Sequence, residues 1–265
     1  YRFNNQLLFE IGPEINFVRA ATDNDAGNRL LNKPFRFATQ WRNAGLYDLK
    51  PILKSLVVDG NKVVVEHDLK GKKDGGFNTK IIYSFFTDGA IKFDFEAEAY
   101  GASILNLPSL PKVGSQWSLP KEMNYMEWYG KGPFHNYSDR SNGTFIKEFG
   151  ATVEEQFVNY PYPQEYGNKM SIRWVTMHNN TDYGLKILPS QPLETSAHNY
   201  TTKNLDQATH TYELKPTKNI FWNLDLKQCG LGNGSCGSNT RYEYCISPKI
   251  NYKFGYQMIP FSIKN

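Results

Sequence analysis

Apolar and charged side chains alternate along residues 90–99, and this period of two is the feature that most restricts the possible folds. The apolar members are Ile91, Phe93, Phe95 and Ala97, and the charged members are Lys92, Asp94, Glu96 and Glu98. Because successive side chains of a strand point to opposite faces, the pattern predicts a half-buried β-strand. Similar stretches predict strands at residues 53–58, 62–68, 80–87, 123–129, 171–178, 183–189, 210–214, 219–226 and 242–246.

Short turn sequences separate many of these strands, at residues 59–61, 87–89, 180–182 and 215–217, and they predict hairpins. No segment of about twelve residues or more shows a helical period. The 14 Pro and 21 Gly residues also interrupt helices, so only short ones are expected, at 152–157 and 205–208. Many strands without crossover helices indicate one all-β domain over residues 1–265, an antiparallel sandwich or barrel.

Composition excludes several classes of protein. The 30 Lys and Arg residues nearly balance 26 Asp and Glu, without a basic stripe, so we expect no nucleic-acid partner. No apolar run approaches the roughly 20 residues that span a bilayer, so no membrane partner is expected. The three cysteines, Cys229, Cys236 and Cys245, fit neither a zinc pattern nor a disulfide framework. We therefore expect no metal site, and we do not favour a disulfide.

Polar clusters lie where the strand period fails, at residues 16–27, 127–140, 160–169 and 227–237. Taken singly, each is typical of a loop. The first lacks the ligand spacing of a calcium loop, and the second lacks the Lys-Ser/Thr pair of a phosphate loop. Among the five histidines, His135 and His198 lie in Asn- and Tyr-rich loops and are the candidates for acid–base chemistry.

In their order along the chain, these clusters resemble the C-terminal small-chain domain of glycoside hydrolase family 2 β-galactosidases. Residues 16–27 resemble the family pattern N-F-x-R-A-P-x-D-N-D-x-G, with Ala21 in place of proline. Residues 129–140 resemble Y-G-x-G-P-x-E-N-Y-x-D-R, with His135 in place of glutamate. The block P-Q-E-x-G-N at residues 163–168, the segment 193–198 and the pair of segments 223–225 and 230–232 complete the resemblance.

The resemblance implies a large two-sheet antiparallel supersandwich like that of galactose mutarotases. It also implies a place in an enzyme that hydrolyses terminal non-reducing β-D-galactose residues with retention. That chemistry uses two carboxyl groups about 5–5.5 Å apart. In the family these groups and the magnesium ligands belong to an upstream TIM-barrel domain, so the resemblance implies no catalytic residue, metal or cofactor in this chain. The expected partners are that upstream domain and a β-galactoside, in a homo-oligomeric parent enzyme.

The resemblance also nominates site residues. Asp23, Asn24, Asp25 and Gly27 would line the substrate pocket, with Gly27 as the hinge of a moving segment at residues 27–34. Ser235 and Cys236 stand in the final loop, where some members carry a tryptophan that stacks on the second sugar. His135, Glu165 and His198 are further candidates.

Two alternatives remain open at this point. A free carbohydrate-binding module would use the Trp and Tyr residues as sugar platforms. A sugar mutarotase would use His135, His198 and Glu165 as acid and base. The first residues show no charged-then-apolar leader, so a cytoplasmic location is expected over export, although the chain begins without Met and resembles a piece of a longer protein.

Overall fold

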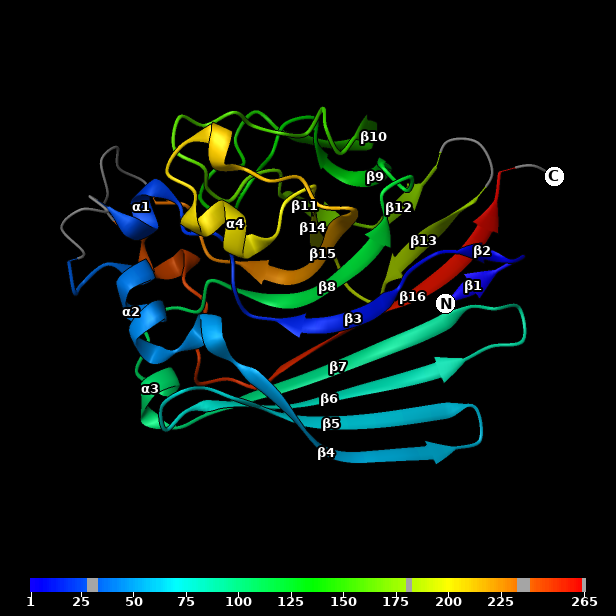
Figure 1. Cartoon of the computed structure of the whole chain (residues 1–265), viewed down its shortest axis with the longest axis horizontal. Helices are drawn as coiled ribbons and strands as arrows, with labels where there is room; N and C mark the ends of the chain where they lie inside the picture. The colour runs from blue at the N-terminus through cyan, green and yellow to red at the C-terminus, as the bar shows by residue number, and fades with distance from the viewer. Residues whose placement is uncertain (28–32, 180–182, 233–238, 264–265) are drawn as a thin grey trace.

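Two antiparallel sheets pack face to face in the computed structural model (Figure 1), which describes residues 1–27, 33–179, 183–232 and 239–263. The larger sheet has nine strands in the order β10-β9-β12-β13-β16-β7-β6-β5-β4, and the smaller has five in the order β11-β14-β15-β8-β3. The larger sheet consists of β4 (Lys50–Asp59), β5 (Lys62–Lys70), β6 (Gly76–Phe85), β7 (Ile91–Tyr100), β9 (Tyr125–Gly132), β10 (Phe145–Thr152), β12 (Trp174–His178), β13 (Tyr183–Pro189) and β16 (Tyr252–Ser262). The smaller consists of β3 (Ile11–Asn16), β8 (Lys112–Pro120), β11 (Lys169–Ile172), β14 (Leu193–His198) and β15 (Asn219–Gln228), and β1 (Arg2–Phe3) pairs with β2 (Gln6–Leu7). The expected two-sheet antiparallel fold is therefore confirmed.

The strand expected at residues 90–99 is confirmed as β7, and its apolar side chains are buried while its charged ones reach the surface. The turns at residues 59–61 and 87–89 join β4 to β5 and β6 to β7 as expected. The turn expected at 180–182 lies outside the described residues. Sequence reasoning missed β3, β8, β10, β14 and β16, because their apolar residues do not alternate strictly with polar ones.

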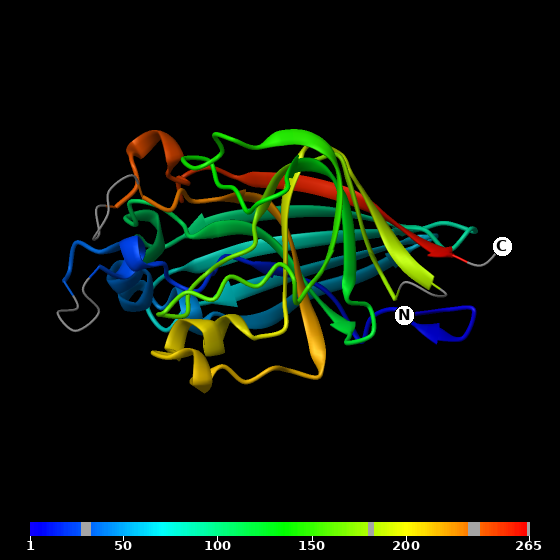
Figure 2. The same cartoon turned by 90° about the horizontal axis from the view of Figure 1, so that it is seen from above.

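Helices are short throughout the described part of the chain. They are α1 (Asp23–Ala26), α2 (Phe37–Ala44), α3 (Ala102–Leu105) and α4 (Thr202–Gln207), with 3-10 turns η1 (Leu46–Asp48), η2 (Thr211–Glu213) and η3 (Tyr242–Tyr244). The helix expected at 205–208 corresponds to α4, whereas α2 was not predicted. Figures 1 and 2 both show α1, α2 and α3 at one end of the sandwich, opposite the hairpin turns of the larger sheet.

The single strand expected at residues 171–178 is divided at Arg173 between β11 and β12, which lie in different sheets. Three other local expectations are wrong. Residues 210–214 form η2 instead of a strand, because the Glu213 carboxylate accepts from the backbone N–H groups of Thr209 and His210 and closes a turn. Residues 242–246 contain η3, where Tyr242 is exposed and offers no apolar face to a sheet. Residues 152–157 form only a turn after β10, because Gln156 N–H donates to Thr152 at 3.3 Å but Phe157 N–H donates to Glu154 instead of Val153, so no second helical bond follows.

The hydrophobic core lies between the two sheets and is rich in aromatic rings. Trp117 of the smaller sheet contacts Phe93 and Tyr256 of the larger one. Trp222 packs against Trp117, and Phe95 packs against Phe93 and Tyr256. The Tyr256 hydroxyl accepts a hydrogen bond from Trp117 Nε1 at 3.0 Å. These rings join the two layers with their polar atoms paired, as buried polar groups require.

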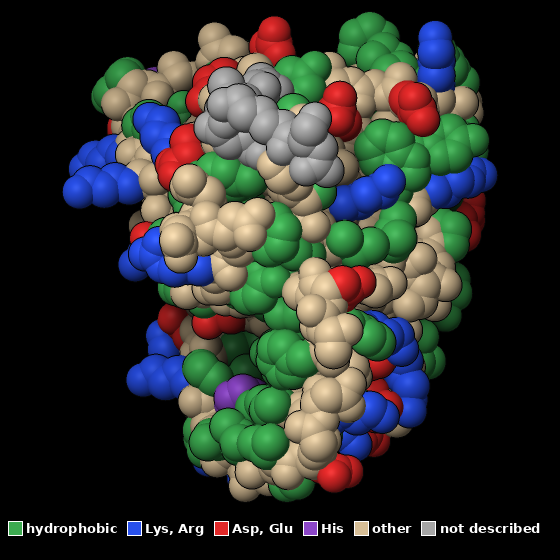
Figure 3. Space-filling model, turned by 90° about the vertical axis from the view of Figure 1, so that its right-hand side faces the viewer, with side chains coloured by type: hydrophobic (Ala, Val, Ile, Leu, Met, Phe, Trp, Pro, Cys, Tyr) green, Lys and Arg blue, Asp and Glu red, His purple; other side chains and the backbone are tan. Residues whose placement is uncertain are grey.

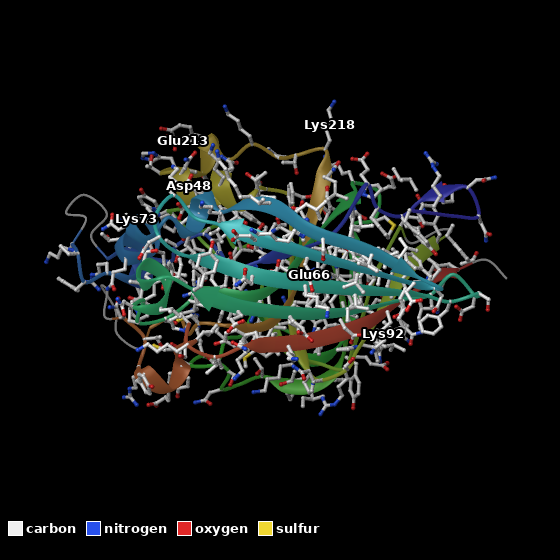
Figure 4. All side chains as sticks on the ribbon, turned by 90° about the horizontal axis from the view of Figure 1, so that it is seen from below. Asp48, Glu66, Lys73, Lys92, Glu213 and Lys218 are labelled. Atoms are coloured by element: carbon white, nitrogen blue, oxygen red, sulfur yellow. The ribbon has the colours of Figure 1, made fainter. Side chains whose placement is uncertain are left out.

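The outer face of the larger sheet is charged, and Figure 4 shows it with Glu66 and Lys92 labelled. Lys92 pairs with Asp94 at 2.8 Å and Lys253 with Glu96 at 3.1 Å. At the hairpin end, hydrophobic side chains reach the surface over the lower half of the view in Figure 3. Exposed apolar residues of β4 and of the β6–β7 hairpin include Val57, Val58, Phe85 and Phe86. The polar clusters of the sequence lie instead at the helix end.

Candidate functional site

A buried ion pair holds α1 against the end of the smaller sheet. Arg19 donates from Nη2 to Asp25 Oδ1 at 2.9 Å and from Nε to Asp25 Oδ2 at 3.1 Å, and both side chains are almost fully buried. The guanidinium also donates to the carbonyl oxygens of Cys229 and Gly230. Although burial acts to lower the pKa of Arg19, the Asp25 carboxylate outweighs it and raises the pKa. Asp25 is thus an anchor of the site instead of a pocket-lining group.

Helix α1 begins with a reciprocal cap. The Thr22 side chain accepts from Asp25 N–H at 3.2 Å, and Asp25 Oδ2 accepts from Thr22 N–H at 3.0 Å. This capping box uses Asp in place of the usual Glu or Gln. It fixes the orientation of Asp23, which is exposed, and Asn24, which is half-buried.

Segments distant in the sequence meet around α1. Gln164 donates from Nε2 to Asp23 Oδ2 at 2.9 Å and accepts from Asp23 N–H at 3.0 Å. Asp139 accepts from the backbone N–H groups of Leu231 and Gly232 at 2.9 and 2.8 Å. Asn24 Nδ2 approaches the Gly232 oxygen at 3.4 Å. All four polar clusters of the sequence therefore converge at one end of the fold.

Gly27 ends α1 in a backbone conformation that favours glycine, with φ 62° and ψ −141°. The Arg36 side chain packs over it, so that a Cβ atom at position 27 would lie 2.4 Å from Arg36 Nε. Residues 28–32 of the segment expected to move lie outside the described residues, as do Ser235 and Cys236. The structure thus places Asp23, Asn24, Asp25 and Gly27 together, and the predictions for Ser235 and Cys236 stay predictions.

The remaining candidates lie deeper, around residues 165–168. Glu165 and His198 are buried, and His198 Nε2 is 2.9 Å from the Tyr166 oxygen. His135 is half-buried, and burial lowers its pKa to about 4, with Arg140 and Lys169 adding to the effect. His135 Nδ1 lies 3.5 Å from Gly167 N. These three residues thus lie around the turn at residues 165–168.

Sequence reasoning missed two positioning residues of this site. Arg19 and Asp139 both belong to the motifs of residues 16–27 and 129–140, but neither was singled out. The sequence did offer a signal for both: each is a charged residue within an otherwise apolar or aromatic motif. A folded protein buries such a charge only when the charge is paired. Their partners, Asp25 and the backbone at 231–232, lie on other turns or far along the chain.

The sequence profile described as "Beta galactosidase small chain" matches residues 1–258. The chain belongs to this β-galactosidase small-chain family. Among its relatives, the β-galactosidase of Priestia megaterium is 29% identical over 262 residues, covering 98% of this chain and 24% of its own length. The β-galactosidase of Lactobacillus delbrueckii subsp. bulgaricus is 32% identical over 238 residues, covering 88% of this chain and 22% of its own.

This small-chain domain spans about a quarter of the length of the curated relatives that it matches. It is also similar in structure to a GalM/aldose epimerase homologue from C. elegans, at 9% identity and a TM-score of 0.44, over 79% of this chain and 69% of that one.

Within the described ranges, no three His, Cys, Asp or Glu residues gather as a metal site. No helix there is long and apolar enough to cross a membrane.

A buried carboxyl pair lies beneath the site of the small-chain domain. Glu194 of β14 is opposite Asp225 of β15, and Lys112 of β8 reaches Asp225 at 3.2 Å. Burial raises the pKa of Glu194 to about 8 and that of Asp225 to about 6. Burial thus favours the protonated form of Glu194, and its carboxyl oxygen accepts from Asn168 Nδ2 at 2.6 Å.

We expect Glu194→Gln to flatten the pH dependence of stability. Because the folded pKa of Glu194 exceeds the unfolded value, its contribution to stability is complete at low pH and is lost as pH rises toward 8, by up to about 1.4 kcal/mol per pH unit. The variant cannot ionise, so its stability relative to wild type should rise between pH 5 and 8. Urea unfolding at several pH values measures this, with the exposed Glu122→Gln as control. Parallel pH profiles for Glu194→Gln and wild type would contradict it.

Proposed function

We propose that this domain completes the active-site pocket of a retaining β-galactosidase that releases terminal non-reducing β-D-galactose, without supplying its catalytic carboxyl groups. Those groups and the magnesium ion belong, in this proposal, to the part of the parent polypeptide outside this chain, which acts as a homo-oligomer. The relatives named β-galactosidase are about four times as long as the matched region, which leaves room for a separate catalytic domain.

The convergence at α1 is the observation that carries the proposal. Asp23 and Asn24 stand near the surface at the helix end, on backbone fixed by the Arg19–Asp25 pair and by Gln164 and Asp139. Carboxylate and amide side chains can accept from and donate to sugar hydroxyls. Rigid support of this kind is what a pocket wall needs to orient a substrate.

Hydrolysis of a chromogenic β-galactoside tests the proposal. We expect no activity from the chain alone and activity after mixing with the separately expressed remainder of its parent. Asp139→Ala should lower that activity about tenfold or more, because Leu231 and Gly232 N–H lose their acceptor and the backbone beside Asn24 is no longer held in place. The exposed Asp59→Ala is the control, with unchanged activity expected.

Activity of the chain alone would contradict the proposal, since the catalytic carboxyl groups would then lie within these residues. Binding of galactosides at millimolar concentration, without activity on mixing, would favour a free binding module. Accelerated mutarotation of fresh α-galactose, followed by polarimetry, would favour a mutarotase.

A further inference from the structure

Two cysteines face each other at the base of the loop that follows β15. Cys229 comes directly after β15, and Cys245 directly after η3. Gly230 N–H donates to the Tyr244 oxygen at 3.1 Å, which closes the base of the loop beside both residues. The Cys245 thiol donates to the Arg241 oxygen at 3.5 Å, one turn before it in the chain. Residues 16 apart in sequence are thus neighbours in space.

The backbone at Cys229 and the backbone next to Cys245 are both hydrogen-bonded to residues 109–111, which come directly before β8. Cys229 N–H donates to the Pro111 oxygen at 2.9 Å, and Leu110 N–H donates to the Ile246 oxygen at 2.8 Å. Ser109 Oγ lies 3.2 Å from Cys229 Sγ and accepts from Ile246 N–H at 2.8 Å. Cys229 and Ile246, the residue after Cys245, are thus both held by hydrogen bonds to residues 109–111, which keeps the two cysteine positions near each other.

The two thiols differ in their exposure to solvent. Cys229 is fully buried, whereas Cys245 is half-exposed and lines a pocket of about 540 Å³ with Asn106, Glu243 and Lys249 among its walls. The neighbouring Cys229 thiol lowers the pKa of Cys245 to about 7. A substantial fraction of Cys245 is therefore thiolate at neutral pH, and the thiolate is the reactive form.

We propose that Cys229 and Cys245 form a reversible disulfide by exchange with a low-molecular-weight disulfide such as oxidised glutathione, which enters at Cys245. The Cys245 thiolate attacks one sulfur of the reagent, whose S–S bond breaks, and one glutathione leaves and takes up a proton. Cys229 then loses its proton and attacks Cys245 Sγ, which releases the second glutathione. Two protein thiols are oxidised and one reagent disulfide is reduced to two thiols, so electrons and protons balance.

The bridge would act on the candidate site through Arg19. The carbonyl oxygens of Cys229 and Gly230 accept from the same guanidinium that pairs with Asp25. A covalent link between positions 229 and 245 would fix the base of the loop next to α1 and remove freedom from the unfolded chain. The disulfide itself does not depend on the proposed function.

Peptide mapping after thiol blocking tests the proposal directly. Treated with oxidised glutathione, the chain should yield a linked peptide pair containing Cys229 and Cys245 that dithiothreitol abolishes. The Cys236→Ser variant should retain this pair and melt about 5–10 °C higher when oxidised than when reduced. Cys245→Ser should lose both effects and leave Cys229 unmodified in the folded state.

A different result would overturn the assignment. Pairing of Cys236 with either residue, a stable glutathione adduct on Cys245, or three alkylatable thiols after oxidation would each show that Cys229 and Cys245 do not form the bridge. An equal melting temperature for oxidised and reduced Cys236→Ser, despite a mapped linkage, would remove the inferred effect on the loop base.

Discussion

Replacing Asp25 with alanine is expected to lower the free energy of unfolding by about 3–5 kcal/mol, because the substitution leaves the Arg19 guanidinium buried without its counter-charge. Arg19 is 0% and Asp25 2% exposed, so water cannot replace the lost carboxylate. The substitution also removes the acceptor of Thr22 N–H at the start of α1. Urea denaturation of the two proteins measures the difference.

The exposed pair of Lys72 and Asp48, 2.7 Å apart, provides the matched control. Asp48→Ala should cost no more than about 1 kcal/mol, because solvent screens this pair. A double variant with Arg19→Met and Asp25→Ala should lose less stability than the sum of the single changes, since no unpaired charge remains. If Asp25→Ala is no more destabilising than Asp48→Ala, the buried pair does not anchor α1.

Gly27→Ala is expected to lower the activity of the reconstituted β-galactosidase at least about tenfold. An alanine there is strained at φ 62°, and its Cβ would lie 2.4 Å from Arg36 Nε. The Arg36 side chain can move aside, but relief of the backbone strain requires the end of α1 to move, which displaces Asp23 and Asn24 from a position that pocket closure would use. A misplacement of about 1 Å can cost roughly 100-fold in rate.

Gly60→Ala is the control for backbone strain alone. Gly60 has φ 57° in the turn between β4 and β5, and nothing lies within 4 Å of the Cβ that alanine would add. This variant should show only a small loss of stability, with activity within about twofold of wild type. Equal activity of the two variants would indicate that the end of α1 has no part in the pocket. The rate at saturating substrate and the KM should be measured separately.

Local pattern accounts for the parts of the fold that were predicted correctly. In β7 the alternation itself carries the information, because the side-chain period of a strand is set by backbone geometry. Helix α2 was missed because it is eight residues long and has no side-chain cap at Arg36. The strand wrongly expected at 242–246 has apolar and aromatic residues in strand-like order, but no neighbouring strand for them to pair with.

For the candidate site, the amino-acid sequence by itself determined the family resemblance, the strand faces and the identity of Asp23, Asn24, Asp25 and Gly27. Only the tertiary structure decided their roles. Gln164 meets Asp23, and Asp139 meets Leu231 and Gly232, across 141, 92 and 93 residues of sequence. It likewise brought Cys229 to Cys245. Strand patterns are set by neighbouring residues, whereas such hydrogen bonds form only after sheet packing brings distant loops to one end, so their partners are not encoded in any local pattern.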